Sequence, residues 1–209
     1  MAFGEPEVRV LFPVPFVTIR LQNAEKLNSG LLAEIATRRK SEPGIDRSNR
    51  YGWHSAIDFF ERAEPAHAEL AQEIDSMVTA IAGKLTPDLP AGLKVVHEGW
   101  VNVSPTHAMN SPHDHAGSFW SGTYYVHVPM PEDEADRQSG AIEFIDPRGS
   151  IGSNAVLETP FTRGRFTARP AAGTCFIWPS FVRHWVHPNR STEERVSIAF
   201  NSRFTRAAK

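Results

Sequence analysis

Apolar residues recur at helical spacing in the first ninety residues of the chain. A first helix is expected after Asn23, whose side chain could cap it, and it would end near the basic run Arg38–Lys40. A second helix is expected over 65–84, where a proline suits the first turn. A short strand over 16–21 precedes them, and a loop over 41–55 separates them. The apolar faces of the two helices comprise Leu27, Leu31, Leu32 and Ile35, and Leu70, Ile74, Met77, Val78 and Ile81.

After residue 90 the pattern changes to short β-branched and aromatic runs separated by Pro and Gly. No long helical pattern lies between these runs, which argues against a parallel βαβ sheet and favours a sandwich or small barrel. We expect a single domain over 1–209, with a helical N-terminal part over 1–90 packed on an all-β core over 91–209. The expected strands are 93–103, 119–128, 141–145, 165–168, 174–178, 184–187 and 195–203.

Composition excludes several classes of protein. The chain has 209 residues, of which 41% are apolar, so it can bury a core and is not disordered. The formal net charge of −2 provides no basic field for nucleic acid, and no apolar run is long enough to cross a membrane. The first residues, Met1–Glu7, do not resemble a signal peptide. The single cysteine, Cys175, cannot form an internal disulfide and lies in an apolar run, so we expect a core residue and a cytoplasmic location.

Histidines cluster in the second half of the chain. His113 and His115 are two residues apart, so in an extended segment both imidazoles would point to the same side. A third imidazole from a distant strand would complete a three-ligand face around a metal. The open positions of such a site could hold oxygen and a chelating organic acid. On the pair alone a polar surface loop is the favoured interpretation, so the third residue decides between the two.

His184 is the preferred third ligand, and His187 competes with it. Strand alternation places these two histidines on opposite faces, so only one of them can point inward. For His187 we expect a solvent-facing side chain before the turn at Pro188–Asn189.

Arg195 and Ser197 share one face of the last strand. A guanidinium can bind a carboxylate with two parallel hydrogen bonds, and a nearby hydroxyl adds a donor. The alternative is an exposed ion pair between Arg195 and Glu193 or Glu194. Tyr124 and Tyr125 are adjacent on a core strand, so one ring must face the interior, where a bound carboxylate could accept its hydroxyl proton.

Several segments in the second half occur in an order typical of one enzyme family. Together they resemble the Fe(II)- and 2-oxoglutarate-dependent dioxygenase superfamily, and within it the branch of 2OG-Fe(II) oxygenases. The segments are Asn110–His115, Ser121–Tyr125, Asp146–Arg148, Phe176–His184 and Glu194–Asn201, and in the N-terminal part Gly52–Ser55.

The resemblance implies a mainly β (α+β) fold, the double-stranded β-helix or cupin-like jelly roll, with iron at one mouth. It implies that Fe(II) is held by His113, His115 and His184, and that Arg195 binds the distal carboxylate of 2-oxoglutarate. Catalysis would depend on these four residues. The co-substrate would be oxidatively decarboxylated while a substrate C–H bond is hydroxylated. Residues expected to assist are Ser197 and Tyr124 or Tyr125 at the co-substrate, and Asn110, Asp114, Arg148 and Asn201 as groups that support the ligands or meet substrate.

One departure from the superfamily pattern concerns the third ligand. The superfamily uses His-x-Asp or His-x-Glu, whereas His115 occupies the carboxylate position here. Asp114 would point the other way in a regular strand, although a bulge could turn it inward as an alternative ligand. A site of three histidines would carry one negative charge fewer than a site with a carboxylate ligand, which could alter the choice of metal. Such a site could also be structural or inactive.

Two other functions remain open. One is a cupin-like metalloenzyme with a three-histidine centre that does not use 2-oxoglutarate, and the other is a non-enzymatic jelly-roll module that binds a ligand. The Arg195-x-Ser197 pair favours the oxygenase. The substrate would be a small molecule or a peptide, and the apolar surface of the two helices would suit a homodimer. Candidates to line the pocket are Trp100, Trp120, Trp185, Arg148 and Arg183.

Overall fold

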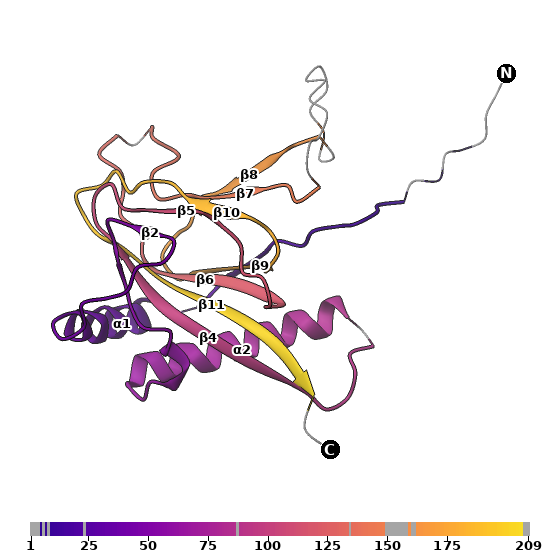
Figure 1. Ribbon diagram of the computed structural model, residues 1–209, viewed down its shortest axis with the longest axis horizontal. Helices are drawn as coiled ribbons and strands as arrows, with labels where there is room; N and C mark the ends of the chain where they lie inside the picture. The colour runs from indigo at the N-terminus through magenta and orange to yellow at the C-terminus, as the bar shows by residue number, and fades with distance from the viewer. Residues whose placement is uncertain are drawn as a thin grey trace.

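The computed structural model describes residues 5, 7, 9–22, 24–86, 88–133, 135–148, 159 and 162–206. Two antiparallel sheets and two helices form three layers, with the helices below the larger sheet in Figure 1. The helical elements are α1 (Ala24–Arg39), the 3-10 turn η1 (Phe59–Glu61) and α2 (Pro65–Leu85). The strands are β1 (Val17–Arg20), β2 (Asn49–Arg50), β3 (Trp53–His54), β4 (Leu93–Ser104), β5 (Met109–His113), β6 (Trp120–His127), β7 (Ile142–Ile145), β8 (Arg165–Ala168), β9 (Thr174–Pro179), β10 (His184–Val186) and β11 (Arg195–Arg206).

The larger sheet has the strand order β1-β9-β6-β11-β4-β3, and the smaller one has the order β2-β5-β10-β7-β8. From β4 onward the chain passes repeatedly from one sheet to the other, and only β7 and β8 are consecutive strands in the same sheet. Every pairing is antiparallel, and β11 pairs with β4 along its whole length. These features define the double-stranded β-helix that the sequence predicts.

The expected helices and strands are confirmed to within a few residues. The expected loop over 41–55 is different, because it contains β2 and β3. Each is two residues long. β2 pairs with the longer strand β5, and β3 pairs with the longer strand β4. Such short strands are specified by their partners and carry no periodicity of their own. Asn23, the expected cap of α1, lies outside the described residues.

The main hydrophobic core lies between the helices and the larger sheet. Leu31, Leu70 and Ile74 from the helices meet Ile177 and Ile198 from the sheet, and all five are fully buried. Cys175 also lies in this cluster, as the sequence predicts. A second, smaller cluster lies between the two sheets, toward the functional site. Neither helix of the described chain is long and apolar enough to span a bilayer.

Candidate metal centre

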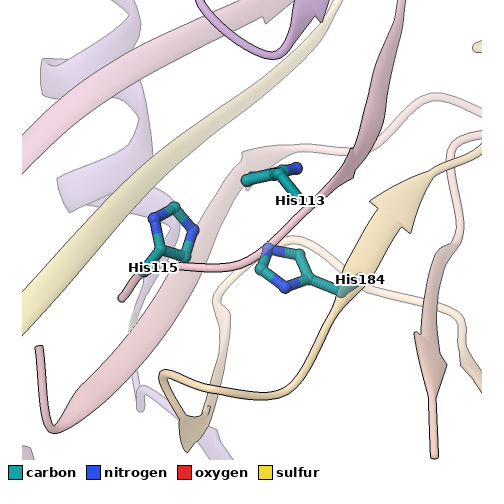
Figure 2. Close-up of side chains that lie close together, drawn as sticks. All are labelled: His113, His115 and His184. Atoms are coloured by element: carbon teal, nitrogen blue, oxygen red, sulfur yellow. The ribbon is translucent and has the colours of Figure 1, made fainter. Parts of the chain in front are cut away.

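Three imidazoles from two strands and one loop meet in the space between the sheets. His113 ends β5 and is the register partner of His184 at the start of β10, while His115 lies two residues beyond β5. One ring nitrogen of each histidine lies within 4.8 Å of those of the other two. Figure 2 shows the three rings gathered around one space. The structure thus brings together the three residues that the sequence selects as ligands.

Backbone carbonyls hold two of the three rings. The Nδ1–H of His113 donates to the Ser111 carbonyl at 2.7 Å, and the Nδ1–H of His184 donates to the Val182 carbonyl at 3.0 Å. Because a carbonyl can only accept, each Nδ1 carries the proton, and each Nε2 keeps its lone pair as an acceptor or metal donor. The Nε2 of His113 lies 3.5 Å from Ser48 Oγ. His115 lacks such a carbonyl, and its Nδ1 lies 3.4 Å from the side-chain amide of Asn201.

Burial keeps the three imidazoles neutral. Together with the neighbouring His113, it lowers the pKa of His184 to about 3 and that of His115 to about 4. Burial also lowers the pKa of His113 below its ordinary value of 6.5. A neutral imidazole is the form that binds a transition metal, so the trio offers nitrogen donors at neutral pH.

Asp114, the alternative ligand, is exposed and stands outside the group of three. An exposed side chain there is what strand alternation predicts for the residue between two inward-facing histidines. Among the described residues, the centre therefore consists of imidazoles without a carboxylate.

Arg195 lies in the same cavity as the three histidines. It is only 2% exposed, and its Nε has no hydrogen-bond partner within the described chain. Its Nη2 donates a hydrogen bond to Ser104 Oγ at 3.4 Å. Burial lowers the pKa of this guanidinium from its ordinary 12.5, although arginine stays charged in proteins. A buried cation without a counter-charge marks a place for an anion.

The exposed ion pair considered for Arg195 is wrong. Glu194 pairs with Arg39 at 2.7 Å, and Glu193 contacts His127 at 3.3 Å. Both glutamates precede β11, whereas Arg195 is its first residue and points between the sheets.

The two adjacent tyrosines point in opposite directions. Tyr125 is fully buried and lines the cavity, with Arg195 Cζ 5.9 Å from its ring centre. Its hydroxyl has no partner among the described residues, and burial raises its pKa. Tyr124 instead donates to Asn28 Oδ1 of α1 at 2.7 Å, on the helix side of the sheet. Tyr125 is therefore the tyrosine that lines the cavity. Tyr124 does not line it, because neighbouring side chains of a strand point to opposite faces of the sheet.

The remaining polar candidates divide between two places. Ser197 and Asn110 line the cavity, and Asn110 Nδ2 donates to Ser48 Oγ at 3.2 Å. Asn201 lies beside His115. Arg148 is not at this site, because it pairs with Asp146 at 2.5 Å and lines a separate cavity of about 430 Å³.

His187 is buried, so the expectation that it faces solvent is wrong. Its Nε2 lies 3.3 Å from Glu143 Oε2, and Trp185 Nε1 donates to the other oxygen of the same carboxylate at 3.1 Å. These groups occupy the face of the smaller sheet opposite His184. The buried Glu143 carboxylate requires hydrogen-bond donors, and His187 supplies one, so its side chain packs against Glu143 and is not exposed to solvent.

Of the other pocket candidates, Trp100 lines the cavity. Trp120 belongs to the helix-side core, and Arg183 is exposed.

Another cavity, of about 310 Å³, also has His113 and His115 in its lining. Arg47, His54 and Glu98 line it, and the sequence interpretation did not select any of them. They come from a loop, a two-residue strand and the first long strand of the core, so no local spacing connects them.

The comparisons with known proteins agree with this geometry. Residues 98–201 match a family model described as "Putative 2OG-Fe(II) oxygenase", and this stretch contains the three histidines and Arg195. The chain belongs to this family of oxidoreductases. A comparison with curated proteins gives no match.

Solved structures share the fold at low sequence identity. A prolyl-4-hydroxylase from Pseudomonas putida has a TM-score of 0.64 and 18% identity, over 92% of this chain and 93% of that one. A prolyl hydroxylase from Trichoplax adhaerens, solved with a hypoxia inducible factor peptide, has a TM-score of 0.62 and 14% identity, over 90% and 82%. The non-heme alpha ketoglutarate dependent epimerase SnoN from nogalamycin biosynthesis has a TM-score of 0.62 and 16% identity, over 90% and 76%.

Proposed function

We propose that the protein is an Fe(II)- and 2-oxoglutarate-dependent oxygenase that hydroxylates a small molecule. One observation carries the proposal: a single cavity has three neutral imidazoles on one side and a buried, unpaired guanidinium on the other. The imidazoles suit Fe(II), and the guanidinium suits one carboxylate of a diacid that reaches the metal with its other end.

In this proposal His113, His115 and His184 hold the iron through the ring nitrogens that face one another. When bound, iron and 2-oxoglutarate supply the oxidising chemistry, in which oxygen-dependent decarboxylation is coupled to hydroxylation of a C–H bond. The protein itself supplies orientation and charge.

Arg195 would bind the distal carboxylate of 2-oxoglutarate through two parallel hydrogen bonds. Ser197 lines the same cavity and adds a hydroxyl donor. Tyr125 is suited to donate a third hydrogen bond, because its raised pKa keeps the phenol protonated and no group of the described residues accepts its proton. A bound carboxylate would thus give an acceptor to Arg195 Nε and to the Tyr125 hydroxyl, neither of which has one within the described chain.

A cupin-like metalloenzyme that does not use 2-oxoglutarate is the second candidate. The observation in its favour is the lack of a carboxylate among the three grouped ligands. The unpaired Arg195 favours the oxygenase, because a reaction without an anionic co-substrate would leave the buried guanidinium unexplained.

The test is a titration of 2-oxoglutarate into the anaerobic Fe(II) protein. We expect the weak visible charge-transfer band of a chelated 2-oxo acid, and we expect Arg195→Ala to weaken the affinity at least about tenfold, since one charged hydrogen-bond pair is lost. Arg203→Ala is the matched control, because Arg203 is an exposed arginine on the same strand. No band, together with equal affinity in the two variants, would contradict the proposal.

We also propose a cytoplasmic location. The lone Cys175 is buried, and burial raises the pKa of its thiol, so the chain carries the inert cysteine expected in a reducing compartment.

A further inference from the structure

The cavity that contains Arg195, called the inner chamber, shares a wall with the cavity of about 310 Å³ that contains Arg47 and Glu98, called the outer chamber. The shared lining consists of His113, His115, Trp100 and Ser48, so the two chambers meet at the imidazoles. A ligand in the outer chamber would lie directly against the candidate metal centre. The lining of this chamber therefore indicates the chemistry of the molecule that reacts there.

The two chambers differ in charge. The inner chamber has one cationic side chain, Arg195, and no carboxylate in its lining. The outer chamber has a charge of each sign, Arg47 and Glu98. The inner chamber thus suits an anion, and the outer chamber suits a ligand that carries both charges.

Both charged groups of the outer chamber are free to bind a ligand. Arg47 is exposed, and within the described chain its guanidinium meets no carboxylate. Glu98 is half-buried, accepts one hydrogen bond from Asn201 Nδ2 at 3.0 Å, and has no cationic partner among the described residues.

One wall of the outer chamber is flat and uncharged. The rings of His54 and Trp100 stack at 5.4 Å with an angle of 11° between their planes. Burial lowers the pKa of His54, and the charge of Arg47 lowers it further, so this imidazole is neutral at pH 7. Such a wall suits an apolar side chain of a ligand.

We propose that the outer chamber binds the substrate, and that the substrate is a free amino acid or a similarly small zwitterion. Its carboxylate pairs with Arg47 and its ammonium group pairs with Glu98, which leaves the side chain against Trp100 and the metal centre. This assignment rests on the proposed function. It goes beyond that function by naming the class of substrate.

Other ligand classes fit the chamber less well. A second dicarboxylate would be repelled by Glu98. A residue within a peptide carries no charged amine or carboxylate on its backbone, so both Arg47 and Glu98 would stay unmatched. The volume of about 310 Å³ is at the lower end for ligand sites, which favours a molecule the size of an amino acid.

The test is calorimetry with the anaerobic Fe(II) protein, with and without 2-oxoglutarate. Each proteinogenic amino acid is titrated as the free zwitterion and again as its N-acetyl amide, which lacks both backbone charges. We expect one or a few free amino acids to bind, and their capped forms to bind at least about tenfold more weakly, because two charged contacts are lost.

The variants Arg47→Gln and Glu98→Gln test the two contacts separately. Each is expected to weaken binding of the free amino acid about tenfold or more. An analogue that keeps the carboxylate but lacks the amine has no partner for Glu98, so Glu98→Gln should bind it no more weakly than the wild type does. Arg20→Gln and Glu73→Gln are the matched controls, because both side chains are exposed and far from the chamber in the fold. Thermal unfolding of every variant identifies any loss caused by misfolding.

Three results would overturn the inference: no free amino acid binds, the capped forms bind equally well, or the variants that fold keep full affinity. The 2-oxoglutarate band is recorded in the same samples. A protein that binds 2-oxoglutarate but no amino acid contradicts this inference alone. A protein that binds an amino acid but no 2-oxoglutarate contradicts the proposed function.

Discussion

At the scale of single residues, the burial of Arg195 does not contribute to the stability of the folded protein. A guanidinium that is 2% exposed and lacks an acceptor at Nε costs free energy in the ligand-free protein. We therefore expect Arg195→Met, which keeps the length and removes the charge, to raise the free energy of unfolding by roughly 1–3 kcal/mol. The same change should abolish the stabilisation by 2-oxoglutarate. Urea unfolding of the metal-loaded protein, with and without the diacid, measures both effects, and a less stable variant would argue that Arg195 is structural.

Tyr124 and Tyr125 form a matched pair for a second prediction. Tyr124→Phe removes the hydrogen bond to Asn28 and should cost about 1 kcal/mol of stability while leaving 2-oxoglutarate affinity unchanged. Tyr125→Phe removes a hydroxyl without a partner, so it should leave stability equal or higher and weaken 2-oxoglutarate binding severalfold. Thermal unfolding and titration of both variants give the comparison. Equal behaviour of the two would show that Tyr125 does not contact the co-substrate.

At the scale of elements, one side chain of α1 caps α2. The Glu34 carboxylate accepts hydrogen bonds from the backbone amides of Ala66 at 2.9 Å and His67 at 3.1 Å, in the first turn of α2. It also contacts His67 Nδ1 at 2.7 Å. Acceptors at a helix N-terminus satisfy amides that have no partner within the helix, so Glu34 replaces the local cap that Glu64 does not supply.

Replacing Glu34 by Ala should lower the free energy of unfolding by about 1–2 kcal/mol at pH 7. Burial raises the pKa of this carboxyl, but the hydrogen bonds from His67 and the two amides outweigh it and lower the net pKa below 4.5. A lowered pKa gives stability that is present above pH 4.5 and is lost as the pH falls through the folded value. The difference between wild type and variant should therefore shrink in acid, as measured by urea unfolding at several pH values. A difference that does not depend on pH would mean that packing, and not the charge, is responsible.

At the scale of the whole molecule, the metal centre links the two sheets. His113 and His184 come from the smaller sheet, whereas Arg195 and Tyr125 come from the larger one. A metal and co-substrate bound between them should stabilise the folded state by about 2.7 kcal/mol at one hundred times the dissociation constant. We expect His184→Ala to lose this gain, while His127→Ala, at the surface, keeps it. Melting temperatures with added Fe(II) or chelator, measured without oxygen, decide between these outcomes.

The alternation of strands made much of the site predictable. It placed Arg195 and Ser197 on one face and separated His184 from His187, because successive side chains point to opposite sides of a sheet. The same alternation required one of the two adjacent tyrosines to face the cavity, although the local pattern did not identify which one. The resemblance of the ordered segments to a family supplied the cofactors.

Features that depend on distant partners were not predictable. The burial of His187 depends on Glu143 from another strand. The two-residue strands β2 and β3 form only by pairing with β5 and β4. The exposure of Asp114 also lay outside the local pattern, because a bulge would have turned the same residue inward.

The sequence by itself determined the two helices, most of the longer strands, the faces of those strands and the residue types available for chemistry, because these follow from local periodicity and side-chain character. Only the tertiary structure decided which of these residues meet. It placed Tyr125 and not Tyr124 at Arg195, left that guanidinium without a carboxylate partner among the described residues, and brought Arg47 and Glu98 into the lining of one chamber. These decisions are made by pairings between segments far apart in the chain, and no spacing within a single segment can encode them.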